Sequence, residues 1–414
     1  MFSLLSSLSR NRRLLKDFVA RDLKARYVGS SMGFFWSVVF PIINLFVYMF
    51  VFRLVLKARW SDQQGATEVA LVMLGGIVVW AAFAETISRA TNSLVENSNL
   101  IQKVVFPSEL LPAYLTISSL INMCIGLPVV LLSVLWFAYL SPPDVHFFDH
   151  RGEGPHEGVL EHQTGELGGA TLVRVALTRG DREDVTVPFT IGGTATLGED
   201  YTIDASPLAI PSGQILSMIK IKPIADDIAE GRESVVLTLG EPSNANLGVG
   251  VGPLSHTIWI ADGIDVGALP PPAPPKANEP LYQPLSLGIQ IAFLPVLFLL
   301  QIVFTVGLAY FLATLNLFLR DTFHLVGVFT TVWMFGTPIF YPAHLVASAR
   351  NGAFAWMLEI NPMYWLIDSY RAVMLFGAWP DWMQILKLAV VAVVMLAAGS
   401  SFFMAQKHKF PDLL

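Results

Sequence analysis

The sequence predicts an α-helical polytopic membrane protein: six transmembrane helices, an interfacial N-terminal helix and a re-entrant hairpin, with an inserted all-β sandwich domain. Three observations support this fold class. Hydrophobic residues make up 54% of the 414 residues and charged residues 14%, whereas soluble domains carry about 25% charged residues. The apolar residues gather in long uncharged runs, as transmembrane helices require. One polar, acidic segment separates those runs into two groups.

Six apolar runs are the predicted spans, because about 20 apolar residues cross the hydrocarbon core of a bilayer. They are 33–52, 69–84 with its flanks, 110–140, the later part of 281–319, 322–341 and 388–406. The uncharged run 281–319 is too long for one upright helix and too short for two spans, so its first part is predicted to lie in the interface. The two transmembrane regions are therefore 33–142 and 281–414.

A proline break divides the apolar stretch 353–377 between the last two spans. Asn361-Pro362 separates two short helical runs, and the second run carries Asp368 and Arg371. Because proline disrupts a helix, we predict a hairpin that enters the outer leaflet and returns. A plain seventh span is the alternative.

Residues 1–32 form an amphipathic segment rather than a span. Leu14, Leu15 and Phe18 recur at helical spacing between cations, which predicts a helix lying in the membrane interface. The basic residues are Arg10, Arg12, Arg13, Lys16, Arg21, Lys24 and Arg26, and Lys407 and Lys409 follow the last span. The positive-inside rule then places both termini in the cytoplasm.

The acidic segment has the composition of a separate body. Residues 144–279 hold 20 acidic and 8 basic side chains, and short β-rich runs alternate in it with Gly, Asp, Asn and Pro clusters. This spacing predicts a β-sandwich at 168–265, between a flexible linker at 143–167 and a proline-rich linker at 266–280. With the termini inside, the joint between spans three and four places this domain outside the cytoplasm.

Sequence motifs exclude two kinds of chemistry. The phosphate-binding pattern G-x-x-x-x-G-K-[ST] is absent, and no glycine is followed by lysine in the sequence, so we expect no ATP hydrolysis by that route. Cys124 is the single cysteine, which excludes an intrachain disulfide or a cysteine metal centre. We predict a transport subunit with no catalytic residues, no cofactor of its own and no nucleic-acid partner.

A series of motifs flanks the predicted spans. They are Lys24-Ala25-Arg26-Tyr27, Ser31–Trp36 with Pro41, Asn99–Pro107, Glu109–Pro112, Leu315–Asp321, Pro338–Tyr341, Asn361-Pro362 and Tyr370-Arg371. In this order they resemble the permease subunits of ABC type-2 exporters, specifically those that move O-antigen, capsule or teichoic-acid polysaccharides. The resemblance covers 1–140 and about 282–414.

The resemblance implies a permease in the bacterial inner membrane that exports a lipid-linked polysaccharide such as O-antigen. Two copies would form a homodimer and bind two ATP-binding subunits, which carry ATP and magnesium and supply the hydrolysis. The cytoplasmic segment 97–109 would be the coupling helix, with an ordinary connecting loop as the alternative. Its implied docking residues are Asn99, Ile101, Lys103, Phe106, Pro107 and Glu109, joined by Arg320 and Asp321 at the second cytoplasmic turn.

Aromatic side chains are frequent around the spans. Sugars stack on aromatic rings, so such rings suit a sliding polymer, although Trp and Tyr also gather at membrane interfaces for lipid reasons. The predicted translocation path contains Phe34, Trp36, Tyr48, Trp80, Phe83, Glu85, Trp333, Phe340 and Tyr341. The acid in this set, Glu85, either faces the path or lies at headgroup level.

The acidic body carries motifs of its own, which are Gly193-Thr194-Ala195, Gly198–Tyr201, Pro211–Gln214, Asp226-Asp227 and Ile260–Asp262. They resemble a Calx-beta domain over 168–263, inserted where exporters of this family have a short joint. The acids Glu199, Asp200, Asp226, Asp227, Glu230 and Asp262 could gather into a calcium site, since calcium takes about six to eight oxygen ligands. Turn-forming acids on an acidic surface are the alternative.

Two other functions remain open. An exporter of a small amphiphile or lipid would share the fold. A cation antiporter that bears a Calx-beta domain would need acids in the middle of its spans, and the predicted spans carry only Glu85, near an end.

Overall fold

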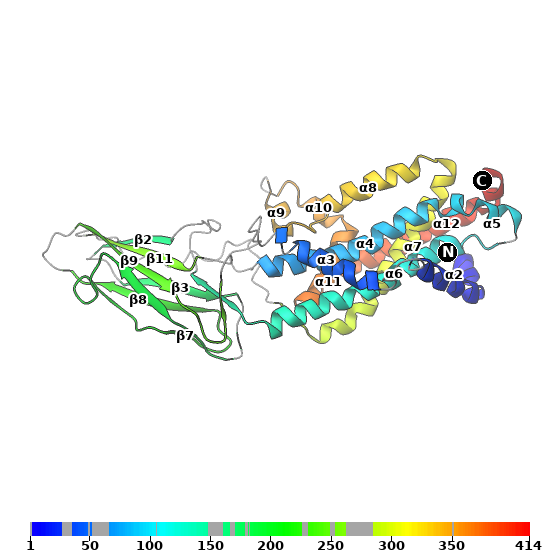
Figure 1. The fold of residues 1–414 in the computed structure, drawn as a ribbon. Helices are drawn as coiled ribbons and strands as arrows, with labels where there is room; N and C mark the ends of the chain where they lie inside the picture. The colour runs from blue at the N-terminus through cyan, green and yellow to red at the C-terminus, as the bar shows by residue number, and fades with distance from the viewer. Residues whose placement is uncertain are drawn as a thin grey trace. The chain divides into compact units, whose positions relative to one another are not determined.

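The chain folds into a helical unit and a β unit, shown as a computed structural model in Figure 1. The helical unit comprises Met1–Tyr48, Leu71–Leu135 and Leu285–Leu414, and the β unit comprises Met49–Ala70 and Trp136–Pro284. The structure describes residues 2–26, 35–48, 50–51, 66–104, 106–147, 160–165, 170–178, 181, 183–225, 231–248, 253–261, 285–349 and 352–414.

Apolar runs become helices in the helical unit because a backbone in lipid must satisfy its hydrogen bonds within the segment. In chain order the helices are α1 (Phe2–Arg10), α2 (Arg12–Ala25), α3 (Trp36–Tyr48), α4 (Ala66–Glu96), α5 (Ser98–Lys103), α6 (Leu110–Leu135), α7 (Leu294–Phe318), α8 (Thr322–Gly336), α9 (Ala343–Ser348), α10 (Trp356–Glu359), α11 (Pro362–Leu375), α12 (Trp382–Gln406) and α13 (Phe410–Leu413). Short turns of other helix types extend three of them: η3 (Trp136–Leu140) after α6, η4 (Ile289–Phe293) before α7 and η5 (Lys407–Lys409) after α12.

Among the described residues, four helical stretches are long and apolar enough to cross a membrane, namely Val69–Glu96, Leu110–Leu140, Ile289–Phe318 and Trp382–Leu413. The other two predicted spans are shorter in the described part of the chain. α8 ends at Gly336 rather than near Tyr341 and has 15 residues, which is about 22 Å at 1.5 Å per residue. Residues 27–34 and 52–65, on either side of α3, lie outside the described residues, so the number of six spans stays a prediction.

Two short helices, α10 and α11, occupy the described part of the predicted hairpin. Ile360 and Asn361 separate them, and the Asn361 side chain caps α11 by accepting hydrogen bonds from the backbone N–H groups of Met363 (3.1 Å) and Tyr364 (3.3 Å). Pro362 suits the first helical position, where its missing N–H costs nothing. The predicted break in the helix is present, whereas re-entry into the membrane stays a prediction.

α7 and α12 approach each other backbone to backbone. A Cβ added at Gly399 would overlap the carbonyl oxygen of Gly307, and a Cβ added at Gly307 would overlap the backbone of Leu396. Small residues permit such an approach between transmembrane helices, whose association in lipid depends on close packing rather than on the exclusion of water. The two glycines therefore set the spacing of α7 and α12.

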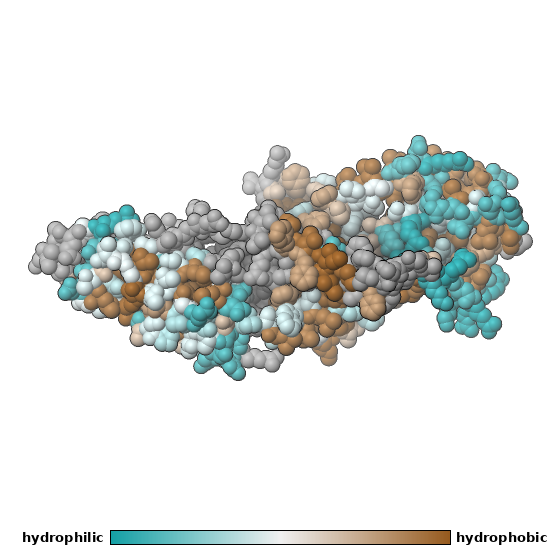
Figure 2. All heavy atoms as spheres, viewed as in Figure 1, coloured by the Kyte–Doolittle hydropathy of each residue, from teal (hydrophilic) through white to brown (hydrophobic). Residues whose placement is uncertain are grey.

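Both ends of the chain pack into the same end of the helical unit, which also carries α5 and the α7–α8 turn (Figure 1). We call it the terminal end. Leu4, Phe18, Phe403 and Phe410 belong to one buried cluster there, together with Tyr310 of α7. Figure 2 shows hydrophilic residues gathered over this end and apolar residues over the middle of the helices.

The β unit is a sandwich around one apolar core. One sheet has the strand order β10-β1-β3-β8-β6, the other has the order β2-β11-β9-β5, and β4 pairs with β7. The strands are β1 (Asp144–Phe147), β2 (Leu160–Gly165), β3 (Thr171–Leu177), β4 (Val185–Val187), β5 (Phe189–Gly193), β6 (Tyr201–Ile203), β7 (Leu208–Ile210), β8 (Leu216–Pro223), β9 (Arg232–Leu239), β10 (Asn246–Leu247) and β11 (Ser255–Ala261). Alternation buries Val173 and Val175 on β3 against Ile219 and Ile221 on β8, as a sheet with one solvated face requires.

The predicted flexible linker at 143–167 is wrong where the structure describes it, because that segment contains β1 and β2. β1 pairs antiparallel with β3 and contributes Val145 and Phe147 to the core. β2 pairs in parallel with β11 along its whole length. The sequence of β2, Leu-Glu-His-Gln-Thr-Gly, has no apolar alternation, so its strand conformation comes from this long-range pairing and not from local preference.

Candidate functional site at the terminal end of the helix bundle

The helix in the predicted coupling segment is shorter than expected. α5 covers Ser98–Lys103, whereas Phe106 and Pro107 belong to no helix or strand, and Ser108 and Glu109 form a turn before α6. A residue that precedes proline avoids the helical region, which explains why the helix does not continue to Glu109. The predicted helix at 97–109 is therefore a helix of 6 residues followed by a loop.

Four described side chains of this segment are exposed, namely Asn99, Gln102, Lys103 and Val104. Val104, which is not among the predicted docking residues, is 58% exposed. Ile101 and Phe106 instead pack onto the bundle, and the Phe106 ring lies 5.5 Å from a phenylalanine ring of α2. An apolar side chain beside polar ones is the kind of surface that protein interfaces use.

Glu109 lies inside the unit and not on its surface. Its side chain is 2% exposed and accepts hydrogen bonds from Ser7 of α1 and from Lys407 Nζ, the latter at 2.6 Å. Its backbone carbonyl accepts a hydrogen bond from the Tyr310 hydroxyl at 2.7 Å. Glu109 thus ties the loop before α6 to α1 and η5 through its carboxylate and to α7 through its backbone carbonyl. The structure therefore gives its side chain a structural role in place of the predicted contact with a partner.

Changing Glu109 to glutamine is expected to destabilise the protein at neutral pH but not in acid. Burial raises the pKa of Glu109, but the hydrogen bonds from Lys407 and Ser7 outweigh it and hold the pKa below its ordinary value of 4.5. Because the folded-state pKa is lowered, the charged form stabilises the fold above pH 4.5, and this stabilisation is lost as the pH falls through the lowered value. The free energy of unfolding should fall by about 1–2 kcal/mol at neutral pH.

Denaturation of the purified protein between neutral and acid pH measures this effect. The exposed Glu359 provides a matched control, since Glu359→Gln removes a carboxylate without a buried partner. If the Glu109→Gln variant and the unmodified protein differed in free energy of unfolding by the same amount at every pH, the stabilising role assigned to the charged Glu109 side chain would be contradicted.

A network of charges fastens α2 to α4 and α6. Asp22 accepts hydrogen bonds from Arg89 and Ser118, and its Oδ2 lies 3.2 Å from Arg26 Nε. Glu85 completes the network, with its Oε1 2.6 Å from Arg26 Nη1 and 3.3 Å from Arg89 Nη1. The predicted path residue Glu85 is therefore paired with two arginines within the chain. The one-turn spacing of Asp22 and Arg26 is visible in the sequence, but their distant partners are not.

Changing Asp22 to asparagine is expected to loosen α2 from the bundle. Burial raises the pKa of Asp22, but the bonds from Arg89 and Ser118 and the nearby charges outweigh it and lower the pKa below 3.8. Loss of this charge should lower the free energy of unfolding by about 2 kcal/mol and speed cleavage of α2 by trypsin. Asp17→Asn, on an exposed position of the same helix, should change neither. Equal effects of the two substitutions would count against the network.

Asparagine side chains order the α7–α8 turn. Asn316 Oδ1 accepts a hydrogen bond from the backbone N–H of Phe323 at 3.2 Å, and Asn316 Nδ2 donates to Asn92 Oδ1 of α4 at 3.5 Å. The predicted docking residues Arg320 and Asp321 are both exposed in this turn. Among the described residues neither side chain has an ion-pair partner.

Arg371 organises the opposite end of the bundle. It is 6% exposed, and its guanidinium donates to the carbonyls of Val72 (3.0 Å), Pro338 (2.8 Å) and Ile339 (3.0 Å). Charge buried near a membrane is costly and needs partners of this kind. Arg371 therefore joins α11 to α4 and to the chain that follows α8.

Several predicted path residues form an aromatic cluster. Trp80 and Phe83 are buried, and the Trp333 ring lies 6.0 Å from that of Trp80 and 5.3 Å from that of Phe83. Trp333 Nε1 also donates to Asn361 Oδ1 at 2.9 Å. In the described part of the single chain, these rings are packed against one another.

The remaining predicted path residues are not brought together with that cluster in the described part of the chain. Phe340 and Tyr341 follow α8 and are half-buried, with the Phe340 ring 6.2 Å from that of Phe335. Phe34 lies outside the described residues. Trp36 and Tyr48 belong to α3, but their side chains also lie outside the described part.

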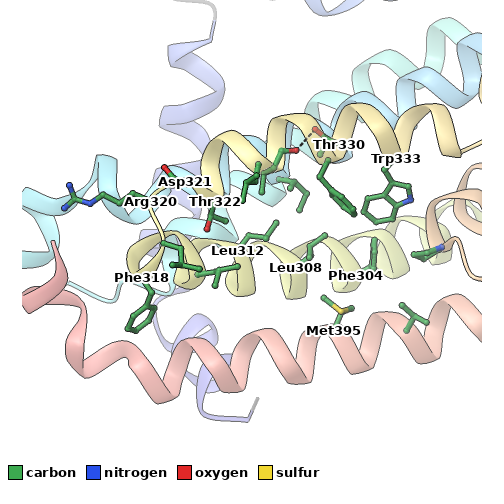
Figure 3. A pocket seen from close by; sticks show the side chains of 18 residues that line it. Phe304, Leu308, Leu312, Phe318, Arg320, Asp321, Thr322, Thr330, Trp333 and Met395 are labelled. Carbon is green, nitrogen blue, oxygen red and sulfur yellow. Dashed lines mark hydrogen bonds between the residues drawn. The ribbon is translucent and has the colours of Figure 1, made fainter.

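An apolar crevice of about 900 Å³ opens between α7, α8 and α12 (Figure 3). Leu308, Leu312 and Met395 line one wall, and Phe329 and Trp333 line the other. Its volume falls in the range of about 300–1,000 Å³ that is typical of ligand sites. Sequence reasoning finds only Trp333 among these five, because apolar residues on three helices give no sign of a gap between them.

Two segments of the chain, 13–149 and 281–375, match the family described as ABC-2 type transporter. The chain belongs to the ABC-2 type transporter family. The O-antigen export system permease protein RfbA of Myxococcus xanthus is 22% identical over 412 residues, which cover 100% of this chain and 99% of that protein. A protein of the same name from Klebsiella pneumoniae is 27% identical over 132 residues, which cover 32% of this chain and 48% of that protein.

Membership of the ABC-2 family makes the chain a membrane-spanning permease subunit, and it implies a partner subunit that binds ATP. The absence of a phosphate-binding loop from the sequence agrees with this division between two polypeptides. The resemblance to ABC type-2 permeases that the sequence motifs indicate is thereby confirmed.

The β unit of this ABC-2 permease resembles a Calx-beta domain, since residues 160–263 match that family. The crystal structure of the apo-form Calx CBD1 domain is 26% identical and covers 30% of this chain and 100% of that chain, with a TM-score of 0.24. A crystal structure titled calcium binding domain CBD12 of CALX1.1 is 28% identical and covers 28% of this chain and 44% of that chain, with a TM-score of 0.23.

The structure describes two of the six acids predicted to bind calcium. Glu199 is exposed, and the Asp200 carboxylate accepts a hydrogen bond from the backbone N–H of Thr196. Asp226, Asp227, Glu230 and Asp262 lie outside the described residues. Within the described ranges, no group of three or more such side chains is close enough to hold a metal ion. Calcium binding therefore stays a prediction.

Proposed function

We propose that this permease exports a lipid-linked polysaccharide of the O-antigen kind across the bacterial inner membrane. The supporting observation is the similarity to the O-antigen export permease of Myxococcus xanthus, which extends over the whole length of both chains and includes the segment that forms the β unit. Two copies of the permease pair, and two copies of an ATP-binding subunit drive them with ATP and magnesium. The path for the glycan lies between the two permeases.

The partner subunit docks at the terminal end. The exposed Asn99, Lys103 and Val104 give it polar, cationic and apolar contacts within one short segment. Movement of α5 then passes to the bundle through the packed Ile101 and Phe106. The exposed cations of α1 and α2, such as Arg10 and Lys16, support a cytoplasmic position for this end. The β unit then lies in the periplasm, where it meets the exported glycan.

Export and subunit assembly test the proposal together. Deletion of the gene should remove the polysaccharide from the cell surface, detected with antibody, and the unmodified gene should restore it. Val104→Asp should prevent copurification of the ATP-binding subunit and abolish export. The melting temperature should not change, because the exposed Val104 side chain buries little surface within the chain. Glu359→Lys, an exposed charge change on α10, is the matched control. Normal surface polysaccharide in the deletion strain would overturn the proposed cargo.

Labelling from outside the cell tests the orientation. With Cys124 replaced by serine, Gln214→Cys at an exposed position of the β unit should react with a membrane-impermeant maleimide once the outer membrane is opened. Asn99→Cys should react only after the inner membrane is also broken. The reverse pattern would overturn the proposed orientation.

A further inference from the structure

Helix α8 is fastened at its two ends and stands apart in its middle. At the terminal end, the side chain of Asn316 accepts a hydrogen bond from the backbone N–H of Phe323. At the other end, Asn361 accepts from Trp333 Nε1 at 2.9 Å and donates from Nδ2 to Thr337 Oγ1 at 2.9 Å. Closing the gap behind α8 would require these polar contacts to break. The crevice is therefore a built feature of the helical unit.

The crevice extends along helix α7. Its α7 wall runs from Phe304 to Phe318, which is about 21 Å of helix at 1.5 Å per residue. The opposite wall comes from Leu325 and Phe329 of α8, and Val391 of α12 contributes to the side. This is about the length of a nearly extended acyl chain, and two of the lining helices, α7 and α12, are long and apolar enough to cross a membrane.

The walls carry almost no free polar group between the two ends. Thr330 lines the crevice, but its hydroxyl donates to the carbonyl of Val326 at 2.8 Å. Water therefore finds few partners there, and apolar cavities of this kind stay dry. An empty gap would forfeit the dispersion contacts of its lining. A hydrocarbon chain from the surrounding bilayer needs no polar partner and makes dispersion contacts with the lining, so it suits the crevice better than water or an empty gap.

The crevice opens at the terminal end beside two charged side chains. Arg320 and Asp321 both line it, both are exposed, and neither forms an ion pair with another described residue. Figure 3 shows Arg320 and Asp321 at the end of the crevice, beyond Leu312. One cation beside one anion matches a headgroup that carries a phosphate and an ammonium.

We propose that the crevice between α7, α8 and α12 binds one zwitterionic phospholipid of the phosphatidylethanolamine type. One acyl chain lies along α7, the phosphate faces Arg320 through charge-assisted hydrogen bonds, and the ammonium faces Asp321. A polyprenyl phosphate has no ammonium and leaves Asp321 beside its own negative charge, so the cargo lipid fits this mouth less well. The turn thereby receives a lipid partner in place of the subunit contact expected from the sequence.

Photocrosslinking locates the lipid. The full chain is purified in detergent and incubated with phosphatidylethanolamine that carries a diazirine in one acyl chain, and cross-linked peptides are identified by mass spectrometry. Cross-links should concentrate on Leu308, Leu312 and Met395 rather than on Val390 and Val394, which are exposed on α12 outside the crevice. Equal labelling of both groups would overturn the proposal, because it would show only lipid around the protein.

Substitutions test the two parts of the site separately. Leu312→Trp fills the crevice and should lower cross-linking several-fold, whereas Val394→Trp adds the same side chain outside it and should not. Arg320→Gln and Asp321→Asn, both on exposed positions, should each weaken retention of the lipid while the melting temperature without lipid stays unchanged. Unchanged retention in all three crevice and mouth variants would overturn the proposal. Stronger competition by polyprenyl phosphate than by unlabelled phosphatidylethanolamine would overturn the choice of lipid.

Discussion

Replacing Arg371 by alanine is expected to be among the most damaging single changes in the helical unit. The guanidinium donates to three carbonyls on two different segments, and its removal leaves those carbonyls buried without their partner. Each unsatisfied buried group costs about 1–3 kcal/mol, so the loss in free energy of unfolding should be at least about 3 kcal/mol. Thermal or denaturant unfolding of the purified protein measures it.

A conservative variant separates geometry from charge at this position. Arg371→Lys keeps the charge but cannot direct three donors along three fixed lines, so it should recover only part of the stability. Lys387→Ala, which removes an exposed cation from α12, should have little effect. Full stability in Arg371→Lys would show that charge alone matters and that the three-carbonyl geometry does not.

Changing Gly399 to alanine is expected to separate α7 from α12. The added methyl group would overlap backbone atoms of Gly307, which cannot turn away as a side chain could. Overpacking of a well-filled interior typically lowers the free energy of unfolding by about 1–3 kcal/mol and occasionally by more. Because the clash here is with backbone atoms, we expect a loss at the upper end of that range. The expected result is a strongly lowered melting temperature or a failure to accumulate in the membrane.

Another helical glycine gives a matched control. Gly327 lies on α8, and a Cβ added there would meet nothing within 4 Å. Gly327→Ala should therefore leave stability unchanged or raise it slightly, because alanine favours the helix more than glycine does. Equal damage from the two substitutions would show that the loss of glycine itself, and not the clash, is responsible.

Long apolar runs were the most predictable part of the fold, because a bilayer imposes both length and composition on a spanning helix. The runs 110–140 and 281–319 correspond closely to Leu110–Leu140 and to Ile289–Phe318. α8 was harder, because the apolar run continues to Tyr341 while the helix stops at Gly336, where Thr337 and Pro338 turn the chain. The composition of an apolar run predicts a helix, but it does not show at which residue the backbone hydrogen bonds of that helix end.

In the β unit, too, only part of the structure could be predicted from local sequence. The run 172–178 alternates and was predictable, whereas β2 forms because β11 offers it a neighbour nearly a hundred residues later. In the candidate site, exposed polar residues such as Lys103 were visible in the sequence. The burial of Glu109 was not, because it depends on Ser7 and Lys407, which lie at opposite ends of the chain.

The packing of the chain ends has a practical consequence for anyone who purifies this permease. Leu4 and Phe410 are fully buried, and Lys407 holds the carboxylate that closes the loop before α6. An affinity tag or fluorescent protein fused close to either end would disturb these contacts at the surface where we propose that the ATP-binding subunit docks. A tag inserted at the exposed Ser212–Gly213 turn of the β unit would leave that surface untouched.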